Sequence, residues 1–196
     1  MKKSTSGILV LSLAFAVCGI SRARGEKPVS EAANWRTKVD QLLPLVGHRN
    51  WILIVDSAYP LQISPGIETI ETGQALPEVT RYVLNALSHS IHVRPDVYMD
   101  AELPFVTDAD APGVSRYRSQ IKTVLGDRKV TPLLHAQLLQ NISEAGRSYK
   151  ILVLKTNETI PYSSVFLRLD CKYWSDAAEA RLRETMKHKA ATSHSR

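Results

Sequence analysis

Two ionisable residues bracket one short apolar run of the sequence. His48 precedes the run WILIV (Trp51–Val55), and Asp56 follows it directly. An imidazole can donate and accept protons near neutral pH, and a carboxylate can accept hydrogen bonds from hydroxyl groups. The pair is therefore a candidate for general acid–base chemistry on a polar substrate.

The apolar run also limits how these two residues can act. Its continuous pattern is typical of a strand that is covered on both faces, and such a strand is about 17 Å long at roughly 3.3 Å per residue. His48 and Asp56 then lie at opposite ends, so a site that uses both needs a loop that folds back or a neighbouring subunit. Ligands of open α/β sheets usually bind beyond the carboxyl ends of strands. This favours Asp56, and from the residues alone His48 is more typical of a structural or surface histidine.

Motifs for other chemistries are missing from the sequence. It contains no GxGxxG, P-loop, HExxH or GxSxG pattern, and its histidines show no metal-ligand spacing beyond the weak pair His89 and His92. We therefore expect no cofactor and no metal.

The first 25 residues have the pattern of a secretory signal peptide. Lys2 and Lys3 precede an apolar segment, Gly7 to Ile20, and small residues follow at Ala23 and Gly25. About 14 apolar residues are fewer than the roughly 20 that span a bilayer, so we expect a secreted or periplasmic protein without a membrane anchor. A lipoprotein modified at Cys18 is less favoured, because the residues before this cysteine are not small.

Removal of the signal peptide would change the charge and the cysteine content. The formal net charge of the chain is +6, and loss of four basic residues with the signal would leave +2. This small excess argues against a nucleic-acid partner, and the basic C-terminal tail is more typical of a solvated helix end than of a polyanion site. Cys171 would be the last cysteine, so no internal disulfide could form.

The remaining sequence predicts one α/β domain, with a linker over 26–34, the domain over 35–174 and a polar helical tail over 175–196. Helical periodicity covers 35–45, 76–90, 114–125 and 134–146, and a polar helix is expected over 176–188. Strand or extended segments are expected over 51–55, 67–70, 97–99, 129–133, 150–155 and 164–169. The order predicts a three-layer domain with a central sheet between helical layers.

Three ordered segments of the sequence carry a resemblance to a known family. They are GHRNWILIVDSAYP from Gly47 to Pro60, LPEVTRYVLNAL from Leu76 to Leu87, and TNETIPYSSVFLRL from Thr156 to Leu169. From about residue 39 to 171 the chain resembles the D-ribose pyranase and L-fucose mutarotase family. The resemblance implies the ribose-pyranase fold and a ring-like homo-oligomer whose pockets are built at subunit interfaces.

The resemblance also implies an activity and the residues for it. His48 matches the catalytic histidine, while Asp56, His135, Tyr162 and Ser164 fall at positions that bind the sugar. The implied enzyme is an isomerase, a mutarotase or pyranase that interconverts anomers or ring forms of a free monosaccharide such as ribose or fucose, by acid–base ring opening and without a cofactor.

Two departures from the family pattern leave alternatives open. Asn50 stands where the family has an aspartate two residues after the histidine, and Ser164 stands where it has an asparagine. Loss of the aspartate is expected to remove a charge that orients His48. A catalytically impaired sugar-binding protein of the same fold is therefore the alternative, followed by a purely structural role. In that last case Asp56 caps a turn, and Tyr162 and His135 are packed side chains.

Overall fold

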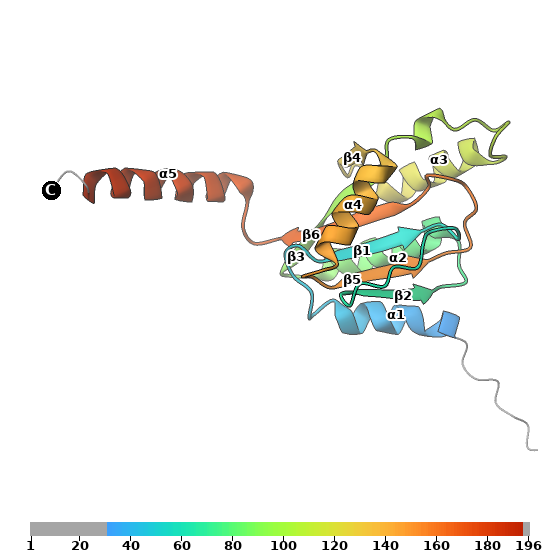
Figure 1. Ribbon diagram of the computed structural model, residues 1–196, viewed down its shortest axis with the longest axis horizontal. Helices are drawn as coiled ribbons and strands as arrows, with labels where there is room; N and C mark the ends of the chain where they lie inside the picture. The colour runs from blue at the N-terminus through green and yellow to red at the C-terminus, as the bar shows by residue number, and fades with distance from the viewer. Residues whose placement is uncertain (1–30, 194–196) are drawn as a thin grey trace, which may run out of the picture.

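The computed structural model describes residues 31–193, which form a six-stranded sheet between helices (Figure 1). The helices are α1 (Glu31–Leu42), α2 (Leu76–His89), α3 (Val114–Leu125), α4 (His135–Ala145) and α5 (Asp176–Ser193), with a short 3₁₀ turn η1 (Leu103–Phe105). The strands are β1 (Trp51–Val55), β2 (Ile67–Glu71), β3 (Val93–Asp100), β4 (Val130–Leu133), β5 (Ile151–Lys155) and β6 (Val165–Cys171).

The order of strands in the sheet is β2-β5-β1-β6-β3-β4. β1 and β2 each pair in parallel with β5, and β3 pairs in parallel with β4. β6 lies antiparallel to both β1 and β3 and joins the two parallel groups. β1 and β3 therefore point the same way, and the start of β6 lies at the edge where both of them end.

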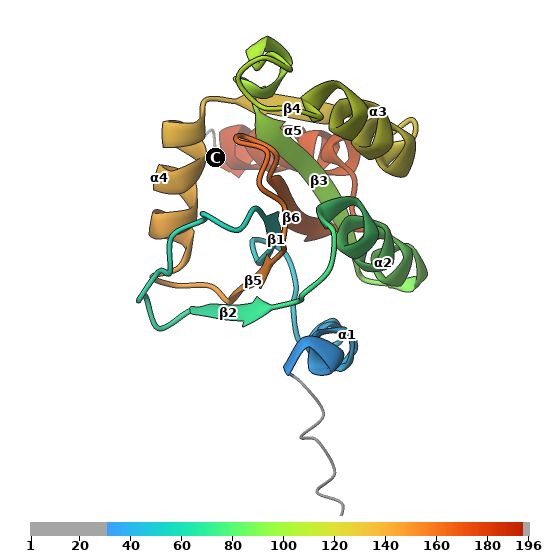
Figure 2. The ribbon, with the colours of Figure 1, turned by 90° about the vertical axis from the view of Figure 1, so that its right-hand side faces the viewer.

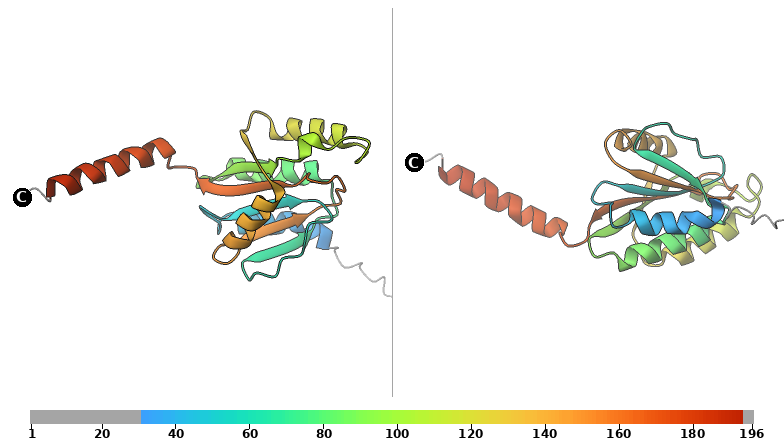
Figure 3. Two further views of the ribbon diagram at one scale, coloured as in Figure 1. Left: turned by 45° about the horizontal axis from the view of Figure 1, so that its top comes forward. Right: turned by 90° about the horizontal axis from the view of Figure 1, so that it is seen from below.

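Helices cover both faces of the sheet, and β1 contributes to both cores. Trp51, Leu53 and Val55 pack in one apolar cluster with residues of α4, whereas Ile52 and Ile54 pack in a second cluster with residues of α1, α2 and α3. Figures 2 and 3 show α4 on one side of the sheet and α1, α2 and α3 on the opposite side. The predicted three-layer α/β fold is confirmed, and burial on both faces explains the continuous apolar run of β1.

Two elements begin earlier than the sequence predicts. α1 begins at Glu31, so the last four residues of the predicted 26–34 linker are helical, in keeping with the helix-forming alanines there. β3 begins at Val93 and runs through Pro95. Proline is tolerated because β3 pairs with β4 only from Val97 onward, which leaves one side of the strand unpaired at Pro95.

The C-terminal part of the described chain lies outside this three-layer body. The predicted signal peptide, Cys18 included, falls outside the described residues, so export remains a prediction. The polar helix expected in the tail is α5, which extends away from the body (Figure 1). In the part of the chain that the structure describes, no helix combines the length and the apolar character needed to cross a membrane.

Truncation of one core side chain gives a direct test of this packing. Ile54 is fully buried, whereas Ile63 in the loop before β2 is 96% exposed. We expect Ile54→Val to lower the free energy of unfolding by about 0.5–1.5 kcal/mol, because it leaves a methyl-sized void. Ile63→Val should leave it unchanged in the same denaturant titration, and equal effects of the two would contradict the assigned core.

Candidate functional site

Asp56 and Ser164 meet at the edge of the sheet where β1 ends and β6 begins. The Ser164 hydroxyl donates a hydrogen bond to Asp56 Oδ2 at 2.9 Å, and the Ala58 amide donates to Asp56 Oδ1 at 2.9 Å. Ser164 is buried, while Asp56 is half-buried. The antiparallel direction of β6 explains the contact, because it brings the residue before β6 next to the residue after β1.

A second polar group lies at the same edge and contains His135 and Tyr162. Asp100 ends β3, and its side chain is fully buried with Oδ1 2.9 Å from His135 Nδ1. The rings of His135 and Tyr162 make an edge-to-face contact with centroids 5.5 Å apart. Because Tyr162 is two residues before Ser164, the structure gathers Asp56, His135, Tyr162 and Ser164 along one edge.

Burial dominates the electrostatics at this edge. It raises the pKa of Asp100, which His135 partly counteracts, while Glu102 and Asp56 raise it further. Burial, Asp100 and Asp56 also hold the pKa of Tyr59 far above its ordinary value. The Tyr59 hydroxyl therefore stays protonated and acts as a donor, to Gln62 Oε1 at 3.3 Å. Asp100 was not predicted as a site residue, although its place at a strand end is the signal that pointed to Asp56.

His48 lies at the opposite end of β1, as the strand length requires. Its Nδ1 is 2.9 Å from Asp170 Oδ1, and Arg49 Nε donates to its Nε2 at 3.2 Å. Since a carboxylate accepts and a guanidinium donates, this pattern corresponds to a neutral imidazole with its hydrogen on Nδ1. A cavity of about 490 Å³ adjoins it, lined by His48, Arg49, Asp170, Cys171, Tyr173, Trp174, Ser175, Asp176, Glu179 and Arg183.

The carboxylate that orients His48 therefore comes from Asp170, near the end of β6. Partial burial acts to raise the pKa of Asp170, but hydrogen bonds from Arg94, the Cys171 amide and His48 outweigh it, so the net pKa is lowered. Arg94 Nη2 lies 2.6 Å from Asp170 Oδ2 because Arg94 and Asp170 are register partners between β3 and β6. No sequence spacing indicates this contact, since it depends on the strand order.

Left-handed backbone occurs next to His48 and in the turn whose tyrosine contacts His135. In residues 31–193 two non-glycine residues have positive φ, Arg49 at 76° and Tyr162 at 58°. A side chain in this region costs roughly 1–2 kcal/mol, and such residues concentrate at functional sites. The Tyr162 turn is held from within by the Ser163 hydroxyl, which donates to Ile160 O at 2.6 Å, and by the Tyr117 hydroxyl on Ser163 O. The Tyr162 turn is thus fixed in its left-handed form.

These features were compared with known proteins. A family model described as the RbsD / FucU transport protein family matches residues 36–171. The chain belongs to this family. The match spans the whole sheet and both histidine groups, that is, the polar side chains around His48 and those around His135. It ends at Cys171, before α5. No curated protein matches the chain significantly.

Solved structures of this family overlap the chain modestly. RbsD of Bacillus subtilis, complexed with D-ribose, has 15% identity over 68% of this chain and 92% of its own, with a TM-score of 0.49. FucU of Bifidobacterium longum has 17% identity, the same coverages and a TM-score of 0.48. The fucose mutarotase of Streptococcus pneumoniae, in complex with L-fucose, has 21% identity over 66% and 89%, with a TM-score of 0.43. The family assignment rests on the sequence match.

Asn50, two residues after His48, has a structural role in this chain. Asn50 Oδ1 accepts a hydrogen bond from the Gly47 amide at 2.7 Å, and Asn50 Nδ2 donates to Lys150 O at 3.0 Å. Asn50 thus fastens the His48 turn to β5. Asn50 itself supplies no charge to His48, and the carboxylate that contacts the His48 imidazole comes from Asp170.

Replacement of Asn50 by aspartate should therefore harm the protein. Asn50→Asp removes the donor to Lys150 O and places a negative charge near that carbonyl oxygen. We expect a loss of about 1–2 kcal/mol in the free energy of unfolding, with no gain in any catalytic rate. Denaturant titration and rate measurement on the same sample test both parts, and a faster variant would show that Asn50 is what limits the chemistry.

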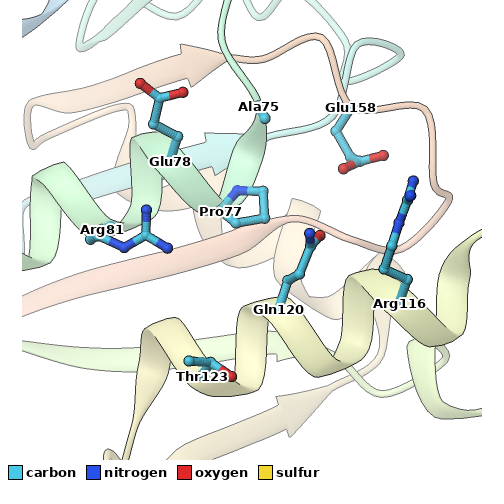
Figure 4. A pocket seen from close by; sticks show the side chains of 8 residues that line it. All are labelled: Ala75, Pro77, Glu78, Arg81, Arg116, Gln120, Thr123 and Glu158. Carbon is cyan, nitrogen blue, oxygen red and sulfur yellow. The ribbon is translucent and has the colours of Figure 1, made fainter.

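A larger cleft lies between α2 and α3, away from both histidine groups (Figure 4). Its volume is about 620 Å³, and it is lined by Ala75, Pro77, Glu78, Arg81, Arg116, Gln120, Thr123 and Glu158. Glu78 pairs with Arg36 at 3.1 Å, and Glu158 Oε1 accepts hydrogen bonds from two backbone amides. With no histidine and both carboxylates engaged, this cleft lacks an acid–base group that works near neutral pH, so it is not the candidate site.

Proposed function

We propose that this member of the RbsD / FucU family interconverts anomers or ring forms of a free monosaccharide. The observation that carries the proposal is the gathering of Asp56, His135, Tyr162 and Ser164 at one edge of the sheet, with a carboxylate-bound His48 at the other. The first group offers acceptors and donors for sugar hydroxyls. The second offers an imidazole whose orientation is fixed by Asp170.

Ring opening of a hemiacetal needs the kind of proton transfer that an imidazole supports. A proton leaves the anomeric hydroxyl, another reaches the ring oxygen, and the reverse steps close the ring on the other face or on another hydroxyl. No redox change or group transfer occurs. Positioned acid and base groups give roughly 10² to 10⁴ in rate, which suffices because aldoses already mutarotate slowly in water.

The two groups can serve one sugar only if two subunits share the pocket. Within one chain β1 separates His48 from Asp56, and no loop of the described residues bonds one to the other. A head-to-tail ring brings the His48 end of one copy against the Asp56 edge of the next. We therefore include self-association into a ring in the proposal, with the pocket at each interface.

Saturation-transfer NMR tests the activity directly. Exchange between anomers and ring forms of D-ribose, L-fucose and D-galactose is measured with and without the protein. We expect faster exchange for at least one of these sugars, with a rate that rises linearly with protein concentration. Unchanged exchange for all three, under conditions where the protein is folded, would exclude the proposed reaction for these substrates.

Complementation between two inactive variants tests the shared pocket. His48→Ala and Asp56→Asn are each expected to be inactive as pure proteins. When they are unfolded together and reassembled, a head-to-tail ring gives about a quarter of the pockets both intact groups, so activity returns. No recovery in mixed rings, confirmed as mixed by native mass spectrometry, would mean that each pocket belongs to one chain.

One contact favours a second function, sugar binding without catalysis. Arg49 Nε donates to His48 Nε2, the nitrogen whose lone pair a general base would use. If Arg49 keeps this bond when the sugar is bound, His48 cannot accept the anomeric proton. Calorimetric titration that shows affinity, together with unchanged exchange in the NMR experiment, would select this function.

A further inference from the structure

The cavity beside His48 has a wall that the family match does not include. Of its lining residues, His48, Arg49, Asp170 and Cys171 lie inside the match over 36–171. The others belong to the C-terminal extension, which is the segment after β6 together with α5, namely Tyr173, Trp174, Ser175, Asp176, Glu179 and Arg183. Figure 1 shows this extension leaving the body at the end of β6, next to the start of β1. The extension thus begins beside His48 in space.

One carboxylate fixes the polar part of this wall. Glu179 accepts a hydrogen bond from Trp174 Nε1 at 2.8 Å on one oxygen and from Arg183 Nε at 2.6 Å on the other. These contacts lower the pKa of Glu179, with the bond from Trp174 as the largest cause. The Trp174 indole, just before α5, and the Arg183 guanidinium, on α5, are therefore held by the same carboxylate, so the three side chains form an arranged group.

The start of the extension is also tied to the group that orients His48. Arg94 Nη2 lies 2.6 Å from Asp170 Oδ2 and 3.9 Å from Asp176 Oδ1. The Ser175 hydroxyl oxygen accepts a hydrogen bond from the Ala178 amide at 3.2 Å, which caps the first turn of α5. The position of the wall is therefore coupled to the Asp170 carboxylate that holds His48.

The chemistry of the wall matches an uncharged, polyhydroxylated ring. Tyr173 and Trp174 expose aromatic surface, and Trp174 is still 44% exposed although its indole N–H is bonded. Formal charges at the cavity balance. Its lining holds three acidic side chains and two arginines, and Arg94 adds a third positive charge by pairing with Asp170. An aromatic face packs against the C–H face of a sugar ring, and the remaining guanidinium and carboxylate atoms can bond its hydroxyls. A balanced cavity gives no advantage to an anion.

We propose that the C-terminal extension supplies the substrate-recognition wall at His48, with Trp174 and Arg183 contacting an uncharged monosaccharide. The inference rests on the proposed function, because it assigns specificity residues to the same site. It gives α5 a role in recognising the sugar, and α5 lies outside the residues that the family model matches. Selection of the sugar by this chain then depends on residues that follow the family match over 36–171.

Kinetic measurements on variants of the C-terminal extension test the proposed recognition wall. Trp174→Ala and Arg183→Ala should each raise KM about tenfold for the sugar that the wild-type protein turns over, with kcat within a factor of two. Arg181→Ala is the matched control, because Arg181 is two residues from Arg183 on α5 and does not line the cavity. Far-UV circular dichroism checks that all three variants retain their helix content.

A binding measurement separates this inference from the proposed reaction. Saturation-transfer difference NMR with D-ribose, L-fucose and D-galactose reports binding whether or not turnover occurs. Binding that Trp174→Ala abolishes supports the wall even if the wild-type protein does not accelerate exchange. If Trp174→Ala and Arg183→Ala turn over the sugar with the same KM as Arg181→Ala, the proposed wall is wrong while the proposed reaction stands. Tighter binding of D-ribose 5-phosphate than of D-ribose overturns the uncharged substrate class.

Discussion

Replacement of His48 by alanine is expected to slow catalysed monosaccharide exchange by about 10² to 10⁴, the contribution of a positioned acid–base group. In the proposed reaction, the imidazole takes the anomeric proton and delivers one to the ring oxygen. Because its side chain is 57% exposed, its loss should hardly change the free energy of unfolding. Saturation-transfer NMR at matched protein concentrations measures the rate, and denaturant titration measures the stability.

A second histidine provides the control for this experiment. His89 is also exposed, lies at the end of α2 and belongs to neither histidine group, so His89→Ala should keep the full rate. Asp170→Asn should give a smaller loss than His48→Ala, because the amide can still accept from Nδ1 but carries no charge. The lowered pKa of Asp170 means that its carboxylate is ionised at neutral pH, so this charge is present in the wild-type protein. Equal rates for His48→Ala and the wild type would remove His48 from the mechanism.

The parts of the site that the sequence predicts are those fixed by local pattern. Asp56 follows an apolar run that had to be a buried strand, and β1 has the predicted bounds Trp51–Val55. His135 begins α4, whose apolar stripe is readable from its period. Strand polarity thus locates Asp56 and periodicity locates the helix that His135 begins, while the assignment of His135 to the site came from the family resemblance.

The parts that the sequence does not predict depend on which strands are neighbours. Asp170 reaches His48 only because β6 runs antiparallel between β1 and β3, and the same order places Arg94 opposite Asp170. Asp100 meets His135 because β3 and β4 are parallel neighbours. The hydrophobic pattern of a strand does not show which strands are its neighbours or whether it runs antiparallel to them. The sequence alone therefore could not assign Asp170 or Asp100 to a histidine.

Replacement of His135 by alanine is expected to destabilise the fold itself. Asp100 is fully buried at its side chain, and its Oδ2 has no hydrogen-bond partner among the described residues. Removal of one member of a buried pair costs about 3–5 kcal/mol, because the other charge stays behind in a poor solvent. His135 is about a third exposed, so water can reach part of the gap and we expect about 2–3 kcal/mol at neutral pH. Thermal and denaturant unfolding at pH 7 measure this loss.

The pH dependence of the variant identifies Asp100 as the cause. The pKa of Asp100 is raised by burial in the native state and lowered by His135, so in His135→Ala it should rise further. A carboxyl with a raised native pKa binds its proton more tightly when folded, so stability falls as pH rises from the unfolded value, about 3.9, to the native one. The double variant Asp100→Asn/His135→Ala has no such proton and should lack this fall. If the single and double variants lose stability in parallel as pH rises, the buried Asp100 charge is not what His135 compensates.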